Sequence, residues 1–403
     1  MNREQLQTPC YVIHKEELEQ GITLLKTALK NHWNHAVVGY SFKTNALPWL
    51  MLQMKEADFY AEVVSEDEYE LAEHLGFTHM IYNGPVKGKD SFLRALKRGA
   101  IVNLDAKREL DWLEESGLKD VTVGLRVNFD LEALCPGETS AAEGGSRFGF
   151  PYETGELKQA IDRLTAMGVK LSGLHLHASS KTRSVNIYRA LAKTACKIKQ
   201  EYGLELAYVD LGGGYFGGMD NKPKFPDYIC AIKEELSAAF TPEETMLIVE
   251  PGTSLVSPPI EYITSVVDCK DTYVGRIVTV DGSRNDIDPL HGKSNYFHEL
   301  MYSGIGADST DKASDADCGR NMLEKQVICG YTCMENDRIF VVENQKELRP
   351  GDRIAFQKSG GYTMCLTPLF IRYFPIVYVE DKGVHTCVRE HWRAEDYVRK
   401  SIL

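Results

Sequence analysis

Short apolar segments alternate with amphipathic segments along the first part of the chain. The apolar segments are rich in β-branched and aromatic residues and are bounded by turn-forming residues, which is the pattern of β-strands. Eight of them are predicted to be strands, at residues 37–42, 59–64, 79–83, 100–104, 121–127, 173–178, 206–211 and 246–250.

Nearly every gap between these strands has the pattern of a helix. Before Gly168, the residues Leu157, Ile161 and Leu164 recur at i, i+4 and i+7, which gives one apolar stripe for packing against a sheet. Ser65 and Glu68 have the spacing of a capping box, in which a hydroxyl and a carboxylate satisfy the first free N–H groups of a helix. Glycine, which readily adopts a positive φ, follows five of the helical patterns, at Gly76, Gly99, Gly117, Gly168 and Gly203.

This alternation predicts a (β/α)8 TIM barrel. An open doubly wound sheet is the alternative, and both architectures place their chemistry at the carboxyl ends of parallel strands. Most of the chemically suggestive residues of this chain fall there: Lys43, Ser65, Asp105, Arg126, His177, Asp210, Glu250 and the glycines after Leu211.

After Gly252 the pattern changes to short, β-branched segments separated by turn formers, which predicts an all-β C-terminal domain. The strand-like residues 9–14 precede the barrel, and we expect them to pair with that domain. The expected organisation is therefore an N-terminal segment, a barrel and a β domain, at residues 1–30, 31–265 and 266–403. Residues 292–326 are polar and irregular, which favours a mobile insertion.

Composition narrows the possible partners. The net charge is −12 without a Lys/Arg-rich run, which argues against nucleic acid. The chain begins without an apolar signal segment and has no apolar stretch long enough to span a bilayer, so a cytoplasmic protein without a membrane partner is expected. Ten cysteines without a CxxC pair favour a reduced enzyme with mostly buried thiols over a disulfide or zinc framework.

The chemistry begins with Lys43, because an amine at the end of a barrel strand points into the site and can attack a carbonyl to form a Schiff base. Glu250 ends the eighth strand and precedes a Pro-Gly turn, while Gly212, Gly213 and Gly214 follow the seventh. Exposed backbone N–H groups in such turns bind phosphate. A lysine, a carboxylate and two glycine turns together describe a pocket for pyridoxal phosphate.

Two alternative sites are weaker. The string GGGYFG matches a dinucleotide fingerprint, but the two prolines that follow stand where its helix should begin, and it follows the seventh strand instead of the first. His175 and His177 lie two apart on a predicted strand, hence on one face, where they could bind a metal. No acidic or cysteine ligand with recognisable spacing accompanies them, so stacking of one ring on the cofactor is favoured and no metal is expected.

A resemblance to a known family rests on a series of motifs in one order. The strings YSFKTN, VVSEDE, NGP, LRVN, SRFGF, GLHLHASS, VDLGGGYFGG, VEPGTSLV, VDGSRND, CMEND and GGYTM run through most of the chain. Together they resemble the fold-type III pyridoxal phosphate decarboxylases, the diaminopimelate and ornithine decarboxylase group. The resemblance implies an alanine racemase-like barrel with a C-terminal β domain.

The resemblance also implies roles for individual residues. Lys43 would form the Schiff base, His177 would stack on the pyridine ring and Glu250 would pair with the ring nitrogen, with Glu62 beside the cofactor. Arg147 stands where the family has a lysine or arginine before Phe-Gly. The phosphate would be held by Ser180, Gly213, Gly214, Gly252, Thr253 and Tyr362.

The resemblance further implies a homodimer with shared active sites, because Cys333 matches a cysteine supplied by the partner subunit. Its thiol would reprotonate Cα after decarboxylation of an amino acid. A carboxylate at Glu250 favours decarboxylation, and the alternatives are a racemase or epimerase of the same fold and an inactive regulatory homologue.

The chain departs from the family pattern at positions that concern the substrate. Thr253 replaces an arginine, and Met334 replaces the acidic residue that meets the distal amine of lysine-like substrates, with Glu335 next in sequence. These departures predict a substrate without the usual distal ammonium.

Overall fold

The computed structural model describes residues 3–141, 145–273, 275–293, 295–303 and 319–402. The chain forms two compact units. The barrel unit is Gln20–Leu255, and the β unit combines Met1–Glu19 with Val256–Leu403, whereas the pattern of the sequence places the boundaries at residues 30 and 265. Among the described helices, none is both long and apolar enough to cross a membrane.

Eight parallel strands close a ring in the barrel unit, in the order β5-β4-β3-β2-β10-β9-β8-β6, and the pairing of β5 with β6 completes the circle. The predicted barrel is therefore confirmed, and the open sheet is excluded. The strands are β2 (Ala36–Ser41), β3 (Tyr60–Val63), β4 (Met80–Tyr82), β5 (Ile101–Leu104), β6 (Thr122–Asn128), β8 (Lys170–His175), β9 (Tyr208–Asp210) and β10 (Met246–Val249), with a short β7 (Phe150–Pro151) beside β6.

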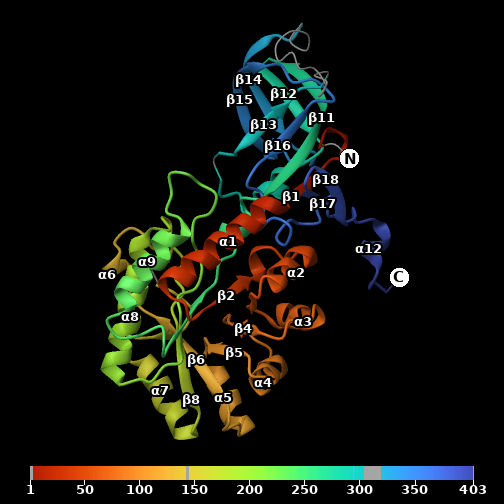
Figure 1. Cartoon of the computed structure of the whole chain (residues 1–403). Helices are drawn as coiled ribbons and strands as arrows, with labels where there is room; N and C mark the ends of the chain where they lie inside the picture. Colours follow the sequence, from red (N-terminus) through yellow and green to blue (C-terminus); the bar gives the residue numbers. More distant parts are fainter. Residues whose placement is uncertain (1–2, 142–144, 274, 294, 304–318, 403) are drawn as a thin grey trace. The chain divides into compact units, whose positions relative to one another are not determined.

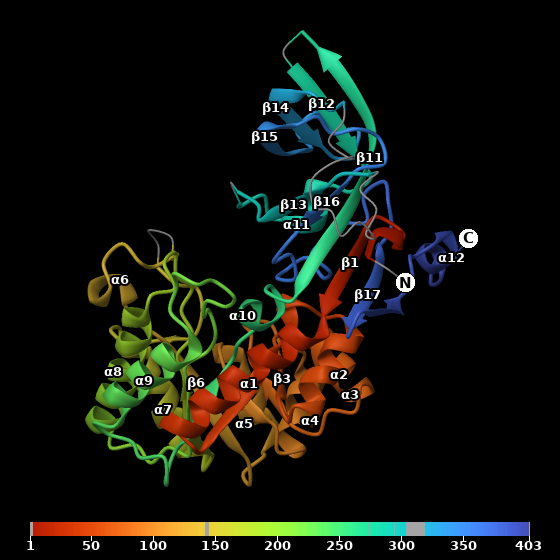
Figure 2. The same cartoon turned by 45° about the horizontal axis from the view of Figure 1, so that its top comes forward.

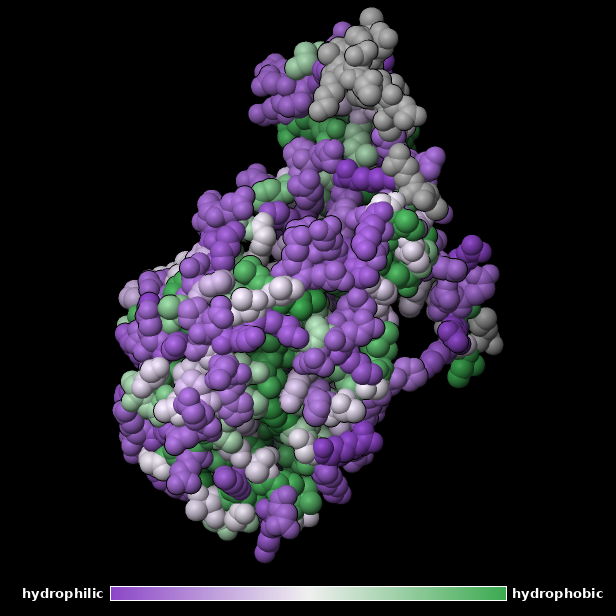
Figure 3. Space-filling model, viewed as in Figure 1, coloured by the Kyte–Doolittle hydropathy of each residue, from purple (hydrophilic) through white to green (hydrophobic). Residues whose placement is uncertain are grey.

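Helices surround this ring (Figure 1). The outer face of the barrel unit seen in Figure 3 is largely hydrophilic, with apolar side chains visible between the helices, as expected for amphipathic helices on a sheet. The helices are α1 (Lys15–His32), α2 (Pro48–Glu56), α3 (Glu66–His74), α4 (Lys89–Lys97), α5 (Lys107–Ser116), α6 (Leu131–Leu134), α7 (Glu156–Met167), α8 (Val185–Tyr202), α9 (Phe225–Leu236) and α10 (Thr253–Val256), with the 3-10 turn η2 (Phe42–Thr44). A second 3-10 turn, η1 (Arg3–Gln5), belongs to the β unit.

The helix signals in the sequence are largely confirmed. Leu157, Ile161 and Leu164 form the buried face of α7. At the start of α3, the Ser65 hydroxyl accepts a hydrogen bond from the Glu68 backbone N–H at 3.2 Å. The Glu68 carboxylate reaches one residue further back than a capping box requires, because it accepts from the N–H of Val64 at 2.8 Å. Left-handed glycines end three helices, at Gly117, Gly168 and Gly203.

The barrel interior is filled by large side chains that need space from neighbouring strands. Ile81, Tyr208 and Ile248 form a buried cluster there. A Cβ added to Gly173 would lie 2.2 Å from the Tyr208 ring, and one added to Gly124 would lie 2.2 Å from its hydroxyl oxygen. The two glycines on β8 and β6 therefore make room for the tyrosine on β9.

The β unit is a nine-stranded sheet in which β1 (Cys10–His14) lies antiparallel to β11 (Ile260–Thr272) and parallel to β17 (Ile376–Asp381) (Figure 2). The expected all-β domain is thus confirmed, and the N-terminal strand belongs to it. The remaining elements are β12 (Gly275–Val280), β13 (His298–Met301), β14 (Met322–Cys329), β15 (Arg338–Lys346), β16 (Arg353–Phe356), β18 (Val384–Arg389), α11 (Arg284–Ile287) and α12 (Ala394–Val398).

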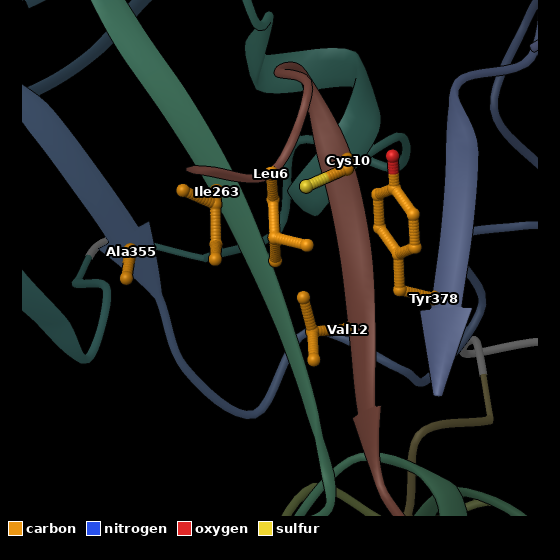
Figure 4. Close-up of a cluster of buried hydrophobic side chains, with 6 residues drawn as sticks. All are labelled: Leu6, Cys10, Val12, Ile263, Ala355 and Tyr378. Carbon is orange, nitrogen blue, oxygen red and sulfur yellow. The ribbon is translucent and has the colours of Figure 1, made fainter. Parts of the chain in front are cut away.

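A buried apolar cluster joins the ends of the chain in this unit (Figure 4). Its side chains come from the first residues, from β11 and from the strands near the C-terminus, so burial of apolar surface stabilises the pairing of β1. The cluster consists of Leu6, Cys10, Val12, Ile263, Ala355 and Tyr378.

Two expectations need correction or restriction. Residues 292–326 are not irregular throughout, because β13 pairs with β16 and β14 begins at Met322, where the strand pattern is masked by polar side chains on an exposed sheet. The central residues 304–318 of the expected insertion lie outside the described residues. Of the nine cysteines that the structure describes, none forms a disulfide and three are buried, so the thiols are not mostly buried.

Asp286 is a buried carboxyl group of the β unit whose raised pKa should affect the stability of the protein. Its Oδ2 accepts hydrogen bonds from the Tyr262 hydroxyl at 2.5 Å and from the Ser283 N–H at 2.9 Å, yet burial raises its pKa to about 6. A carboxyl whose pKa is higher in the folded than in the unfolded state contributes stability at low pH, and this contribution is lost as the pH rises through the folded value.

We predict that Asp286→Asn, which keeps an acceptor for both donors, stabilises the protein at pH 7 by on the order of 1–3 kcal/mol. The advantage should shrink as the pH falls from about 7 towards 4. Chemical unfolding across this range measures it, with the exposed Asp220→Asn as the control. A difference that does not change with pH would contradict the assignment.

Candidate active site

Lys43 lies in the turn η2, directly after β2, at the carboxyl end of the barrel. Its Nζ donates to the Ser41 hydroxyl at 2.8 Å and to Glu62 Oε2 at 2.7 Å. The Glu62 side chain on β3 is almost fully buried, whereas that of Lys43 is 33% exposed. A partly accessible amine is therefore held in place by a carboxylate in the barrel interior.

Glu250 follows β10 and lies in the same polar network. Its Oε1 accepts a hydrogen bond from Asn83 Nδ2 at 2.5 Å, and the same amide donates to Glu62 Oε1 at 3.0 Å. Both carboxylates are nearly inaccessible to solvent. One buried amide thus joins the partner of Lys43 to the carboxylate on the other side of the site.

Asp210, at the end of β9, adds a third buried carboxyl group. Burial raises its pKa well above the ordinary value, and the adjacent Glu250 carboxylate adds to this effect, so Asp210 keeps its proton. Its Oδ1 accepts from the Gly212 N–H at 2.9 Å. Among the described residues, Glu250 forms no ion pair with a lysine or arginine, and a buried carboxylate in such surroundings favours a positively charged ligand.

His175 lies beside this pair as the last residue of β8. Its Nε2 is 3.5 Å from Glu250 Oε2, and neither ring nitrogen has a hydrogen-bond partner among the described residues. Burial and the charge of Arg126 lower its pKa well below the ordinary value, so the ring is neutral. His175 therefore does have acidic neighbours, but they come from other strands and are not apparent from spacing in the sequence. Side-chain atoms of His175, Asp210 and Glu250 that could bind a metal lie within 4.8 Å of one another.

His177 lies two residues beyond the end of β8, so the two histidines do not share a strand as predicted. Their rings are nonetheless nearly parallel, with centroids 6.2 Å apart. Nδ1 of His177 accepts from the Gly213 N–H at 3.1 Å, and burial lowers the pKa of the ring to about 3. A neutral, oriented imidazole thus borders the glycine turn.

Two glycines at the carboxyl end of the barrel allow close backbone packing, Gly213 against the Glu250 turn and Gly252 against Thr44. A Cβ added to Gly213 would lie 2.1 Å from the carbonyl oxygen of Glu250, and one added to Gly252 would lie 2.3 Å from Thr44 Cγ2. Gly214 is exposed and has φ +101°, and Thr253 begins α10. Gly213 and Gly252 are themselves buried and permit this close packing, whereas Gly214 is the exposed glycine of the first turn.

The other barrel residues singled out in the sequence make contacts with residues outside this network. Ser180 accepts from the Arg183 N–H at 2.9 Å, and Asp105 forms a buried ion pair with Arg126 at 2.8 Å. Arg147 is exposed, and its guanidinium stacks on Phe148.

Four predicted site residues belong to the β unit. Cys333, Met334 and Glu335 are exposed in a turn before β15, and Tyr362 is half-buried with a positive φ of 60°. Met334 borders a cavity of about 200 Å³ with His291, Phe370 and other residues of this unit.

The cavity beside Met334 contains one carboxylate, and that carboxylate is occupied by its own neighbours. Asp337 accepts hydrogen bonds from the Ser283 hydroxyl, the Arg284 N–H and the hydroxyl and N–H of Thr332, at 2.7–3.2 Å. The other polar lining residues, Asn285, His291, Thr332 and Asn336, carry no carboxylate.

The sequence does not single out Asn83 or Asn103, and it does not reveal that Asp210 is a buried, neutral carboxyl group. Asn83 directly follows β4, so the strand-end rule could have found it. Asn103 lies within β5 and carries no such signal, because an inward-pointing amide in a strand looks like any other polar residue.

Comparison with known proteins places the chain in a family. The family described as "Pyridoxal-dependent decarboxylase, pyridoxal binding domain" matches residues 16–257. A probable chloroplastic diaminopimelate decarboxylase of Oryza sativa subsp. japonica is 27% identical over 97% of this chain and 79% of its own length. The L-glutamyl-[BtrI acyl-carrier protein] decarboxylase of Niallia circulans is 25% identical over 99% of this chain and 95% of its own length.

The fold is shared with solved structures. Diaminopimelate decarboxylase of Methanocaldococcus jannaschii in complex with L-lysine superposes with a TM-score of 0.83, at 22% identity over 99% of this chain and 93% of that one. The chain belongs to the pyridoxal-dependent decarboxylases. It is therefore a pyridoxal phosphate-dependent carboxy-lyase acting on an amino-acid substrate, and the racemase alternative is set aside.

The donor set at the carboxyl end of the barrel fits this cofactor. Pyridoxal phosphate needs an amine, an anionic partner for its ring nitrogen and backbone donors for its phosphate. Lys43 is the amine, Glu250 is a buried carboxyl group that forms no ion pair with a lysine or arginine among the described residues, and Gly214 exposes the backbone of the glycine turn.

Proposed function

We propose that Lys43 attaches pyridoxal phosphate covalently through its amine and that Glu250 pairs with the ring nitrogen. The observation that carries this proposal is the single network in which Asn83 joins Glu250 to Glu62, the carboxylate that holds Lys43. When bound, pyridoxal phosphate supplies an electron sink for the electron pair left at Cα as CO₂ departs. A carboxylate at Glu250 keeps a proton at the ring nitrogen, which strengthens that sink.

The surrounding residues orient the cofactor. His177, which is neutral, stacks on the ring face, and Glu62 keeps the Lys43 amine at the strand ends. The phosphate is bound by backbone and hydroxyl donors, which need no cation and so tolerate Thr253 in place of an arginine. In the barrel unit these donors come from Ser180, Gly214, Gly252 and Thr253, since the N–H of Gly213 is already bonded to His177 Nδ1.

We also propose a homodimer in which Cys333 of one subunit serves the cofactor of the other. Its thiol is exposed in the single chain, as a proton donor for a neighbouring subunit must be. In this role Cys333 holds a proton and delivers it to Cα after CO₂ has left. Arg147, Met334 and Glu335 then lie around the substrate.

The substrate is an amino acid whose distal end is not a free ammonium. Met334 occupies the position where the family pattern has an acidic residue. The carboxylate of Asp337 in the adjoining cavity already accepts four hydrogen bonds. Burying an ammonium there without an available carboxylate costs several kcal/mol. The relative from Niallia circulans, which is named for a glutamyl group on a carrier protein, supports a substrate of this kind.

The first prediction concerns the attachment of the cofactor. The purified protein should show a visible absorption band, and borohydride should fix the cofactor on the tryptic peptide that contains Lys43, as detected by mass spectrometry. Lys43→Ala should lose the band, whereas Lys55→Ala, which removes an amine on α2, should keep it. Fixation at a different lysine would refute the proposal.

The second prediction concerns the shared site. Lys43→Ala and Cys333→Ala chains should each be inactive alone, and mixing them under subunit exchange should restore CO₂ release, because each heterodimer then contains one native site. A mixture of Lys43→Ala with a Lys43→Ala/Cys333→Ala double variant is the control. Self-contained sites would give no recovery although exchange is demonstrated by mass spectrometry.

The third prediction concerns specificity. Ornithine, lysine and diaminopimelate should be poor substrates, with kcat/KM at least about a hundredfold below that of a substrate with a neutral or acidic distal end. Met334→Glu should raise kcat/KM for the diamino acids, and Met334→Gln should not. Efficient turnover of ornithine by the unmodified enzyme would show that another residue, with Glu335 the first to test, supplies the charge.

A further inference from the structure

Asn83 is a buried amide whose two hydrogens are directed at two different carboxylates. It follows β4, and its side chain lies between Glu62, on the neighbouring strand β3, and Glu250, after β10. Nδ2 donates to Glu62 Oε1 at 3.0 Å and to Glu250 Oε1 at 2.5 Å. An amide nitrogen has two N–H groups, so both are used and neither carboxylate can turn away without leaving one unsatisfied.

The orientation of this amide is fixed from behind. Oδ1 of Asn83 accepts from Asn103 Nδ2 at 2.8 Å, and Oδ1 of Asn103 accepts from the Tyr208 hydroxyl at 2.7 Å. Burial raises the pKa of Tyr208 well above the ordinary value, so its hydroxyl keeps its proton and is the donor. Each amide therefore has one possible orientation, and every donor in the chain of residues points towards the carboxylates.

We propose that Asn83 is a positioning residue that holds Glu62 and Glu250 at a fixed separation, with Tyr208 and Asn103 fixing its orientation. The inference rests on the proposed function, in which Glu62 holds the Lys43 amine and Glu250 meets the ring nitrogen. Asn83 itself touches neither the amine nor the cofactor ring in this assignment. It aligns Glu62 and Glu250, so that the Lys43 amine and the Glu250 carboxylate can bind the aldehyde and the ring nitrogen of one rigid ligand at the same time.

The side chain must be an asparagine for this role. An aspartate at position 83 has the same shape but no N–H groups, and it would place another carboxyl beside Glu62 and Glu250, which already lie near Asp210. A leucine would leave both carboxylates without their donor. Tyr208→Phe removes only the hydroxyl that orients the relay and leaves the carboxylates untouched.

The test uses the full-length protein with and without pyridoxal phosphate. We expect Asn83→Asp to raise the dissociation constant of the apoprotein for pyridoxal phosphate by about tenfold or more, since it removes hydrogen bonds to charged groups. It should also shift the pH midpoint of the visible band. Tyr208→Phe should change both quantities in the same direction by less. The control Asn344→Asp adds the same charge at an exposed position of β15 and should change neither.

A double variant separates a relay from a general loss of stability. If Tyr208 acts through Asn83, Asn83→Asp/Tyr208→Phe should bind pyridoxal phosphate no more weakly than Asn83→Asp alone, whereas independent effects would add. Additive effects, or an unchanged affinity and pH profile in Asn83→Asp, would overturn the proposal. If Asn83→Asp does not fold, as judged by thermal unfolding of the apoprotein, an unchanged Tyr208→Phe overturns it instead. Failure of the proposed function is distinguishable, because it would leave the visible band intact in Lys43→Ala.

Discussion

Glu62, Asp210 and Glu250 bring three buried carboxyl groups together at the carboxyl end of one barrel. Burying a carboxylate costs free energy unless hydrogen-bond donors or cations surround it. Each of these three groups is stabilised in a different way. Glu62 has the Lys43 amine, and Asp210 keeps its proton. Glu250 has an amide but, in the part of the chain that the structure describes, no ion pair with a lysine or arginine, and this difference suits the site to a ligand with a protonated ring nitrogen.

Glycines on neighbouring strands and turns of the barrel make this arrangement possible. The missing Cβ atoms of Gly124 and Gly173 admit Tyr208, whose hydroxyl begins the relay of hydrogen bonds that ends at the carboxylates. The missing Cβ atoms of Gly213 and Gly252 bring the two turns close to Glu250 and Thr44. Packing and chemistry are therefore not separate in this unit, because the same small residues serve both.

The sequence predicts the fold well because its signals are local and repeat. Each barrel strand is an apolar run, and several helices are followed by a glycine, so the elements can be recognised one at a time. Lys43 and Glu250 are also found from sequence, since both follow a strand. The bridging role of Asn83 is not, because it depends on two carboxylates that are 21 and 167 positions away. Likewise, the proton on Asp210 follows from burial beside Glu250, which spacing does not encode.

The position of β1 has a consequence for the newly made chain. The barrel unit is one continuous stretch, Gln20–Leu255, so all its strands are available once that stretch has left the ribosome. In contrast, β1 at Cys10–His14 pairs with β11 and β17, which are synthesised much later. While the barrel is being translated, both edges of β1 therefore remain unpaired. During this time β1 is an apolar segment that other nascent chains or chaperones can bind.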